Sequence, residues 1–74
     1  MSDSAAVKRH QVSSRAIRSV GYRAGTLEIE FVDGDVYRYF SVPPSVFLEL
    51  MQAESKGAFF NERIRDRFEF DGPI

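Results

Sequence analysis

The segment TLEIEFV alternates between apolar and polar side chains. Leu27, Ile29 and Phe31 lie on one face of an extended chain, and Glu28 and Glu30 lie on the other. A period of two is typical of a strand that is covered on one face and exposed on the other. This segment therefore predicts a sheet with one buried face.

The preceding segment, IRSVGYR, predicts a second strand that ends at an Ala-Gly turn. If this turn is a two-residue loop, Val20 and Tyr22 extend the apolar face of the hairpin. A loop longer by one residue would turn Ser19 and Gly21 to that face and would bury less apolar surface. The pattern favours the two-residue loop.

A third strand, VYRYF, follows the turn sequence VDGD, which is a strong hairpin signal. A two-residue turn would place Val36 and Arg38 on the apolar face of the sheet. A three-residue loop over residues 32–34, with its glycine left-handed in a bulge, would place Tyr37 and Tyr39 there instead.

The charges decide between these two registers. The first register buries Arg38 without a partner, which costs several kcal/mol in desolvation. The second register places Arg38 opposite Glu28 on the outer face, where the two side chains can form a cross-strand ion pair. We therefore predict the three-residue loop, in which Tyr22, Tyr37 and Tyr39 share the inner face of a three-stranded antiparallel sheet.

Two helices are predicted after the third strand. Pro44 suits the first turn of a helix, and the apolar residues that follow predict an amphipathic helix over residues 44–54. Ser55 is placed to cap a second helix. The buried face of that helix is marked by three residues spaced four apart, Phe60, Ile64 and Phe68. The segment FEF at 68–70 forms either a last turn or a short added strand.

These elements predict an α+β fold of order β-β-β-α-α, in which two helices pack on one face of a three-stranded antiparallel sheet. The opposite face is expected to be open to solvent and charged. Residues 12–70 form this single domain. Residues 1–11 are polar or small and predict a disordered leader, and residues 71–74 predict a frayed C-terminus.

The composition removes several classes of site. The chain has 74 residues, no cysteine and one histidine, His10, so we expect no disulfide, no metal site and no other cofactor. No apolar run approaches the ~20 residues of a membrane helix, and the N-terminus lacks the apolar segment of a signal peptide. We expect a cytoplasmic protein without a membrane partner, either a monomer or a weak homo-oligomer because its core is small.

The net charge of −1 is unevenly distributed along the chain. On the second helix, Lys56, Arg63 and Arg67 fall within one narrow stripe beside the apolar face. One interpretation is an edge that contacts phosphates, with aromatic neighbours. The other, which charge patterning favours, is a solvated face paired with nearby acidic side chains.

The pair formed by Tyr37 and Tyr39 also has two interpretations. Aromatic side chains at alternate strand positions stack bases in RNA-recognition sheets. The same alternation matches the apolar face of the neighbouring strand, which the helices should cover, and tyrosine suits a half-buried place of this kind. The pattern favours a position in the core or at its edge.

No group of side chains predicts catalysis. An enzyme needs a base, a nucleophile and an orienting group in one pocket. Ser13, Ser14 and His10 lie near the N-terminal leader without fixed geometry, and Glu28 and Glu30 have an open, wet setting that would not shift a pKa. We therefore expect a protein that is not an enzyme.

Several segments in order, VSSRAIRSVGY, LEIEF, VYRYFSVPPSVF and ESKGAFFNERIR, together resemble the KTSC domain. This short module occurs at the C-terminus of some lysyl-tRNA synthetases and as small stand-alone proteins in bacteria and phages. The resemblance covers roughly residues 12–68, and its hallmark is a central Tyr-x-Tyr. The positions that match its patterns, and to which we assign a structural role, are Tyr37, Tyr39, Gly57, Phe60, Asn61 and Ile64.

The resemblance implies neither an enzyme activity nor a cofactor, and RNA binding has been suggested for the family. The leading hypothesis is a small non-enzymatic binding module for RNA or single-stranded nucleic acid. It would bind through the basic residues on the second helix, Lys56, Arg63, Arg65 and Arg67. The alternative is a protein-interaction or self-associating adaptor domain that uses the exposed sheet face or an uncovered strand edge.

Overall fold

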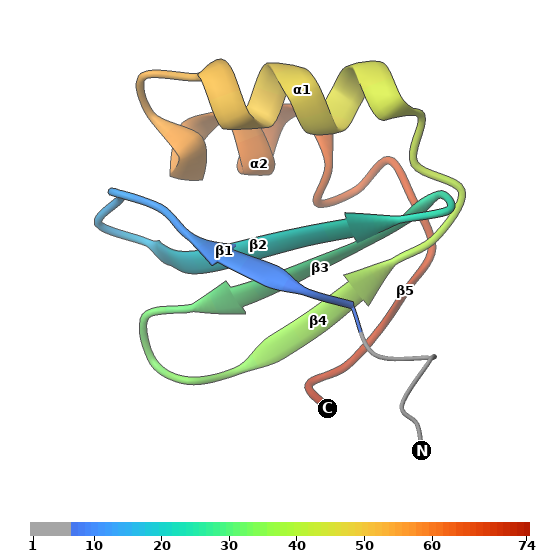
Figure 1. Cartoon of the computed structure of the whole chain (residues 1–74), viewed down its shortest axis with the longest axis horizontal. Helices are drawn as coiled ribbons and strands as arrows, with labels where there is room; N and C mark the ends of the chain where they lie inside the picture. The colour runs from blue at the N-terminus through green and yellow to red at the C-terminus, as the bar shows by residue number, and fades with distance from the viewer. Residues whose placement is uncertain (1–6) are drawn as a thin grey trace.

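The computed structural model describes residues 7–74 and shows an α+β fold, which confirms the predicted class. The strands are β1 (Arg9–Gln11), β2 (Ile17–Arg23), β3 (Thr26–Phe31), β4 (Val36–Tyr39) and β5 (Phe70–Asp71), and the helices are α1 (Pro44–Gln52) and α2 (Lys56–Arg63). Within the described residues the sheet has five strands in the order β1-β2-β3-β4-β5, and all neighbours are antiparallel. Both helices lie on one face of this sheet (Figure 1).

The predicted register of the three central strands is confirmed. Tyr39 pairs with Leu27 and Arg38 pairs with Glu28, which leaves residues 32–34 as a three-residue loop. The glycine of this loop, Gly34, has a φ of +97°, the left-handed conformation that glycine adopts without steric cost. The hairpin between β2 and β3 also has the expected two-residue turn, because Tyr22 pairs with Leu27.

The hairpin formed by β2 and β3 contains an irregularity that the alternation of apolar and polar residues did not predict. The register shifts between Ile17 and Ser19, so that Arg18 occupies a bulge in β2. As a result Ile17 and Val20 both lie fully buried on the inner face although they are three residues apart. A β-bulge changes the side-chain alternation in this way because it adds one residue to a single strand.

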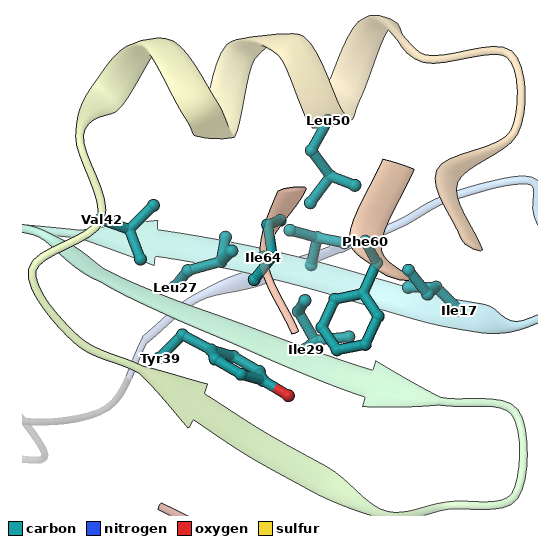
Figure 2. Close-up of a cluster of buried hydrophobic side chains, with 9 residues drawn as sticks. Ile17, Leu27, Ile29, Tyr39, Val42, Leu50, Phe60 and Ile64 are labelled. Carbon is teal, nitrogen blue, oxygen red and sulfur yellow. The ribbon is translucent and has the colours of Figure 1, made fainter. Parts of the chain in front are cut away.

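The hydrophobic core lies between the inner face of the sheet and the two helices. Figure 2 shows its side chains converging from β2, β3, β4 and both helices. The fully buried members are Ile17, Leu27, Ile29, Leu50, Ile64, Val20 and Val42. Phe60 and Tyr39 complete the cluster and are almost as deeply buried.

Both helices begin as the sequence predicts but end earlier. Pro44 occupies the first turn of α1, and the Ser55 hydroxyl caps α2 by accepting a hydrogen bond from the Ala58 N–H at 3.2 Å. The helix α2 ends at Arg63, and the N–H groups of Ile64 and Arg65 both donate to the Phe60 carbonyl. The chain then turns back toward β4 and forms the strand β5, which includes only Phe70 of the segment 68–70.

The prediction of three strands is wrong because both ends of the described chain join the sheet. Arg9–Gln11 forms β1 against β2, where a disordered leader over residues 1–11 was predicted. Phe70–Asp71 forms β5 against β4, and the Ile74 N–H donates to the Val36 carbonyl at 2.8 Å, where a frayed end was predicted. The side chains of both strands are mostly exposed, so no apolar alternation marks them in the sequence. Backbone pairing holds them, together with the ion pair of Arg9 with Glu28 and the contacts of Phe70 with Tyr37 and Tyr39. Residues 1–6 of the predicted leader lie outside the described residues.

The outer face of the sheet is less open than expected. Glu28 is only 4% exposed, because the guanidinium groups of Arg9 on β1 and Arg38 on β4 both donate to its carboxylate. The two arginines approach Glu28 from the strands on either side of the β2–β3 pair. This carboxylate therefore ties together three segments that are far apart in the sequence.

Gly21 allows the N-terminal segment to lie against this face. A Cβ atom at Gly21 would lie 2.5 Å from the Lys8 carbonyl oxygen and 2.7 Å from a methyl carbon of Val7. Because Val20 and Tyr22 point to the helices, the missing side chain is on the outer face. The close approach of residues 7–9 depends on its absence.

We expect Gly21→Ala to lower the free energy of unfolding by about 1–3 kcal/mol, the usual cost of overpacking. An alanine in an unobstructed strand position would be mildly stabilising instead, so the sign of the change is informative. Urea unfolding followed by circular dichroism measures it. In a chain that lacks residues 1–8 the cost of Gly21→Ala should shrink, and an undiminished cost would contradict the proposed contact.

We expect Glu28→Gln to cost about 1–3 kcal/mol of unfolding free energy, because two arginines lose a largely buried anionic partner. Glu30→Gln is the matched control, since Glu30 bonds Ser19 and bridges Arg18 at a more exposed position. Its cost should stay below about 1 kcal/mol. Equal costs for the two variants would show that the Glu28 ion pairs add nothing specific.

Candidate functional site

The four basic residues predicted to bind nucleic acid do not form one helical stripe. Lys56 begins α2, and its ammonium group donates to the Ala53 carbonyl at 3.1 Å. Arg63 ends α2 and donates to the Glu49 carboxylate on α1 at 3.2 Å, with its guanidinium 5.3 Å from the centre of the Phe59 ring. Lys56 and Arg63 therefore both form hydrogen bonds with residues in or directly after α1.

Arg65 and Arg67 lie beyond the end of α2, in the turn that leads to β5. The i,i+4 relation expected between Arg63 and Arg67 on a helix is absent, because the helix ends at Arg63. Both Arg65 and Arg67 are exposed. Unlike Arg63 and Lys56, they lie beside an aromatic surface of the sheet.

That surface is a groove of about 590 Å³ between the end of α2 and the sheet. Its lining comes from β3, β4, α2, the turn after α2, and the C-terminal segment: Phe31, Tyr37, Tyr39, Phe60, Arg65, Asp66, Phe70 and Gly72. A shallower hollow adjoins it, and Asp66 and Phe70 line both. Arg67 lines this second hollow, so that one continuous surface carries both Arg65 and Arg67.

The rings of the groove form a contact network. Tyr37 and Tyr39 lie 6.4 Å apart between ring centroids, with their planes inclined by 28°. The Phe70 ring lies 5.8 Å from Tyr37 and 5.6 Å from Tyr39. Phe60 packs edge-on against Tyr39 at 5.4 Å. These distances fall in the range in which aromatic pairs attract one another.

The two tyrosines of the Tyr-x-Tyr motif differ in burial. Tyr39 is 4% exposed and belongs to the core cluster, whereas Tyr37 is half-buried and packs at the edge of the core. Phe70 is 53% exposed. Tyr39 thus lies in the core and Tyr37 at its edge, and the same two residues also line an open groove.

The tyrosine hydroxyl groups have different surroundings. The Tyr22 hydroxyl donates to the Val42 carbonyl. Within residues 7–74, the Tyr37 and Tyr39 hydroxyls have no such protein partner, and no fully shielded side-chain oxygen is left unpaired. The Tyr39 hydroxyl must therefore keep contact with solvent, and Tyr39 is one of the residues that line the groove.

Burial raises the pKa of Tyr39 to about 12, and the neighbouring Tyr37 adds to the effect. The guanidinium of Arg65 acts in the opposite direction and lowers the pKa of Tyr39, while the carboxylate of Asp66 raises it. Both charged side chains are therefore close enough to influence the hydroxyl. The groove combines aromatic faces, a hydroxyl group, a cation and an anion.

Sequence reasoning assigned no role to Phe70, Asp66 or Gly72. A Cβ atom on Gly72 would lie 2.7 Å from the Tyr37 ring, so the glycine lets the C-terminal segment pass across that ring. The FEF segment carried a signal for an added strand, and this signal would have brought Phe70 to the edge of β4. Nothing in the sequence pattern placed Asp66 beside Tyr39.

The other positions of the predicted structural motif lie outside the groove, except Phe60. Ile64 is fully buried. A Cβ atom on Gly57 would lie 3.1 Å from the Ala16 side chain, so this glycine lets α2 pack closely against the loop before β2. Asn61 is exposed.

Metal and membrane sites find no support in the part of the chain that the structure describes. Residues 7–74 contain no cluster of three or more histidine or carboxylate side chains able to hold a metal ion. Neither helix of this part is long and apolar enough to cross a membrane.

We expect the hydroxyl of Tyr39 to lose its proton at a pH about two units above that of an unperturbed tyrosine. Because the pKa of folded Tyr39 exceeds the value of 10.0 for an unperturbed tyrosine, the folded state keeps its proton while the unfolded chain loses it. The contribution to stability is complete below pH 10 and is lost as the pH rises from 10 to 12. Ultraviolet absorbance of tyrosinate after a rapid pH jump measures the titration. The titration step near pH 12 should be absent in Tyr39→Phe. If the step persists in this variant, it belongs to another residue.

The fold and part of the sequence are shared with known proteins. A lysine–tRNA ligase of Nostoc punctiforme is 54% identical over 46 residues, which are 62% of this chain and 8% of the ligase. An uncharacterised protein of Stutzerimonas stutzeri is 43% identical over 58 residues, which cover 76% of this chain and 82% of that protein. The chain thus spans a small part of the ligase and most of the second relative.

The arrangement of helices and strands also matches a solved structure. The crystal structure of a KTSC domain protein from Yersinia pestis superimposes with a TM-score of 0.84 at 38% sequence identity, and the match covers 89% of this chain and 96% of that protein. The sequence profile of the KTSC domain matches residues 13–68. This range includes every strand and helix except β1 and β5. The chain belongs to the KTSC domain family.

Proposed function

We propose that this domain is a non-catalytic module that binds single-stranded RNA across the surface formed by the aromatic groove, Arg65 and Arg67. The observation that carries the proposal is the position of Arg65 in the wall of the groove, together with the exposed Phe70 ring and the half-buried Tyr37 ring. Proteins that bind single strands combine cations for the phosphates with aromatic rings for the bases. The lysine–tRNA ligase relatives act on an RNA substrate by their name, which makes RNA the favoured polymer.

The charge distribution limits how tightly such a module can bind. The chain has a net charge of −1, so affinity must come from a few local contacts rather than from a general positive field. Arg63 is partly neutralised by Glu49, and Lys56 is engaged by the Ala53 carbonyl. We therefore assign the main phosphate contacts to Arg65 and Arg67, and secondary contacts to Lys56 and Arg63.

The adaptor alternative has less support in the described residues. An adaptor that adds a strand to the sheet needs a long, unpaired edge. The two edge strands β1 and β5 have three and two residues, and short edges of this kind limit pairing between chains. The outer face is occupied by the ion pairs of Glu28.

The proposal predicts salt-dependent binding of RNA that depends on two arginines. A labelled single-stranded RNA of about ten nucleotides is titrated by fluorescence anisotropy at about 50 mM salt and then at higher salt. Arg65→Gln with Arg67→Gln should weaken binding and lower the salt slope by about 1.4, because each lost contact to a single strand accounts for about 0.7.

The matched control removes the same charge elsewhere. Arg15→Gln with Arg18→Gln takes two exposed cations from the region before and within β2, and it should leave both affinity and slope nearly unchanged. Lys56→Gln with Arg63→Gln tests the stripe that the sequence suggested and should have a smaller effect. Absence of salt-dependent binding, or an equal loss in all three pairs, would refute the proposal.

A further inference from the structure

The groove is lined by a residue whose hydroxyl makes no hydrogen bond within the described protein. Tyr39 is 4% exposed and lines the groove, and its hydroxyl keeps contact with solvent. A ligand that displaces this solvent must supply a hydrogen bond in its place, because an unpaired hydroxyl loses its hydration without compensation. Figure 2 shows the Tyr39 ring within the core cluster beside Phe60, with its hydroxyl at the edge of that cluster. A ligand in the groove would meet this group at its floor.

The charged groups around the hydroxyl are of both signs. Arg65 and Asp66 both line the groove, and their charges act in opposite directions on the pKa of Tyr39. A guanidinium donates hydrogen bonds and a carboxylate accepts them. The polar end of the groove thus suits a ligand that presents acceptors and donors side by side.

The remaining lining is aromatic. Tyr37 is half-buried and Phe70 is 53% exposed, so both rings offer surface to a planar ligand. Phe70 belongs to a strand of two residues, which can adjust more easily than the core strands on which Tyr37 and Tyr39 lie. The groove volume of about 590 Å³ is within the range of small-molecule sites.

A purely apolar occupant fits these features poorly. An aliphatic or phenyl side chain of a partner protein would cover the Tyr39 hydroxyl and the two charged groups without pairing them, which is costly. A phosphate alone would satisfy Arg65 but would meet the carboxylate of Asp66 and leave the rings unused. A nucleobase has a planar face for the rings and an edge with adjacent donors and acceptors.

We infer that the groove is a nucleobase site, in which a base stacks on the exposed Phe70 ring, packs against the inclined Tyr37 ring, and presents its edge to the Tyr39 hydroxyl, Arg65 and Asp66. This inference rests on the proposed RNA binding and assigns the groove to the base, while the phosphates lie along Arg65 and Arg67. The Tyr-x-Tyr motif then has two roles. Tyr39 supports the core and presents a polar group, and Tyr37 supplies a second aromatic wall.

The test uses the four neutral ribonucleosides, which carry a base but no phosphate. Each is titrated to about 10 mM into the isotopically labelled full chain, and backbone and side-chain shifts are followed by nuclear magnetic resonance. Shifts are expected at the residues that line the groove. Inorganic phosphate is the parallel probe, and it should perturb Arg65 and Arg67 without perturbing Phe70.

Two variants measure the separate parts of the site. Tyr39→Phe removes only the hydroxyl and should weaken nucleoside binding about three- to tenfold, the effect of one hydrogen bond. Phe70→Ala removes an exposed ring and should weaken it about tenfold or more. Leu48→Ala, at an apolar residue of similar exposure on α1, is the control and should change nothing.

The outcomes separate the two proposals. If RNA binds with the expected dependence on Arg65 and Arg67 but nucleosides cause no shifts in the groove, the base site is refuted and the proposed function stands. Nucleoside shifts that are unchanged in both Tyr39→Phe and Phe70→Ala also refute the base site. If nucleosides bind in the groove while RNA shows no salt-dependent binding, the base site stands and the proposed function is refuted.

Discussion

The register between β3 and β4 is the constraint on which both faces of this sheet depend. The three-residue loop at 32–34 places Tyr37 and Tyr39 beside Ile29 and Leu27. A slip of one residue would turn both tyrosines to the outer face and bury Arg38, since side chains alternate along a strand. Two unrelated features thus share one cause. The inner face gains the tyrosines that form part of the core and the groove, and the outer face gains the pairing of Arg38 with Glu28.

The central strands were predictable because each carries its own pattern. Alternation and turn residues placed β2, β3 and β4, and the cost of burying Arg38 selected the register without any tertiary information. The strands β1 and β5 carry no such pattern. Their side chains are mostly exposed, and they join the sheet through backbone pairing, the ion pair of Arg9 with Glu28 and the contacts of Phe70 with two tyrosines, none of which a local pattern reveals. The sequence shows a glycine at position 21, but it does not predict that the backbone of Lys8 packs closely against it.

The candidate site was predictable only in part, for a related reason. The spacing of Phe60, Ile64 and Phe68 suggested a helix that continues through Arg67. The chain leaves the helix at Arg63 and still buries Ile64 and part of Phe68, because a turn can direct apolar side chains inward as well as a helix can. That departure takes Arg67 out of the predicted helical stripe and leaves Arg65 in the wall of the groove. Periodicity identifies which side chains are buried, but it does not show where a helix stops.

The groove is lined partly by residues inside the segment that matches the KTSC domain and partly by residues beyond it. Tyr37, Tyr39, Phe60 and Arg65 lie inside the segment that matches the KTSC domain, residues 13–68, whereas Phe70 and Gly72 lie beyond it. The floor and the cationic wall therefore belong to the part that defines the family, and one aromatic wall belongs to a two-residue strand held by β4. The core requires the Tyr39 ring, so this ring is fixed by packing whatever the ligand. The Phe70 wall contributes less to the core, because more than half of its surface is exposed. If the groove binds the base proposed above, its polar anchor is therefore fixed by the packing of the core, whereas its outer wall is held mainly by contacts with Tyr37 and Tyr39.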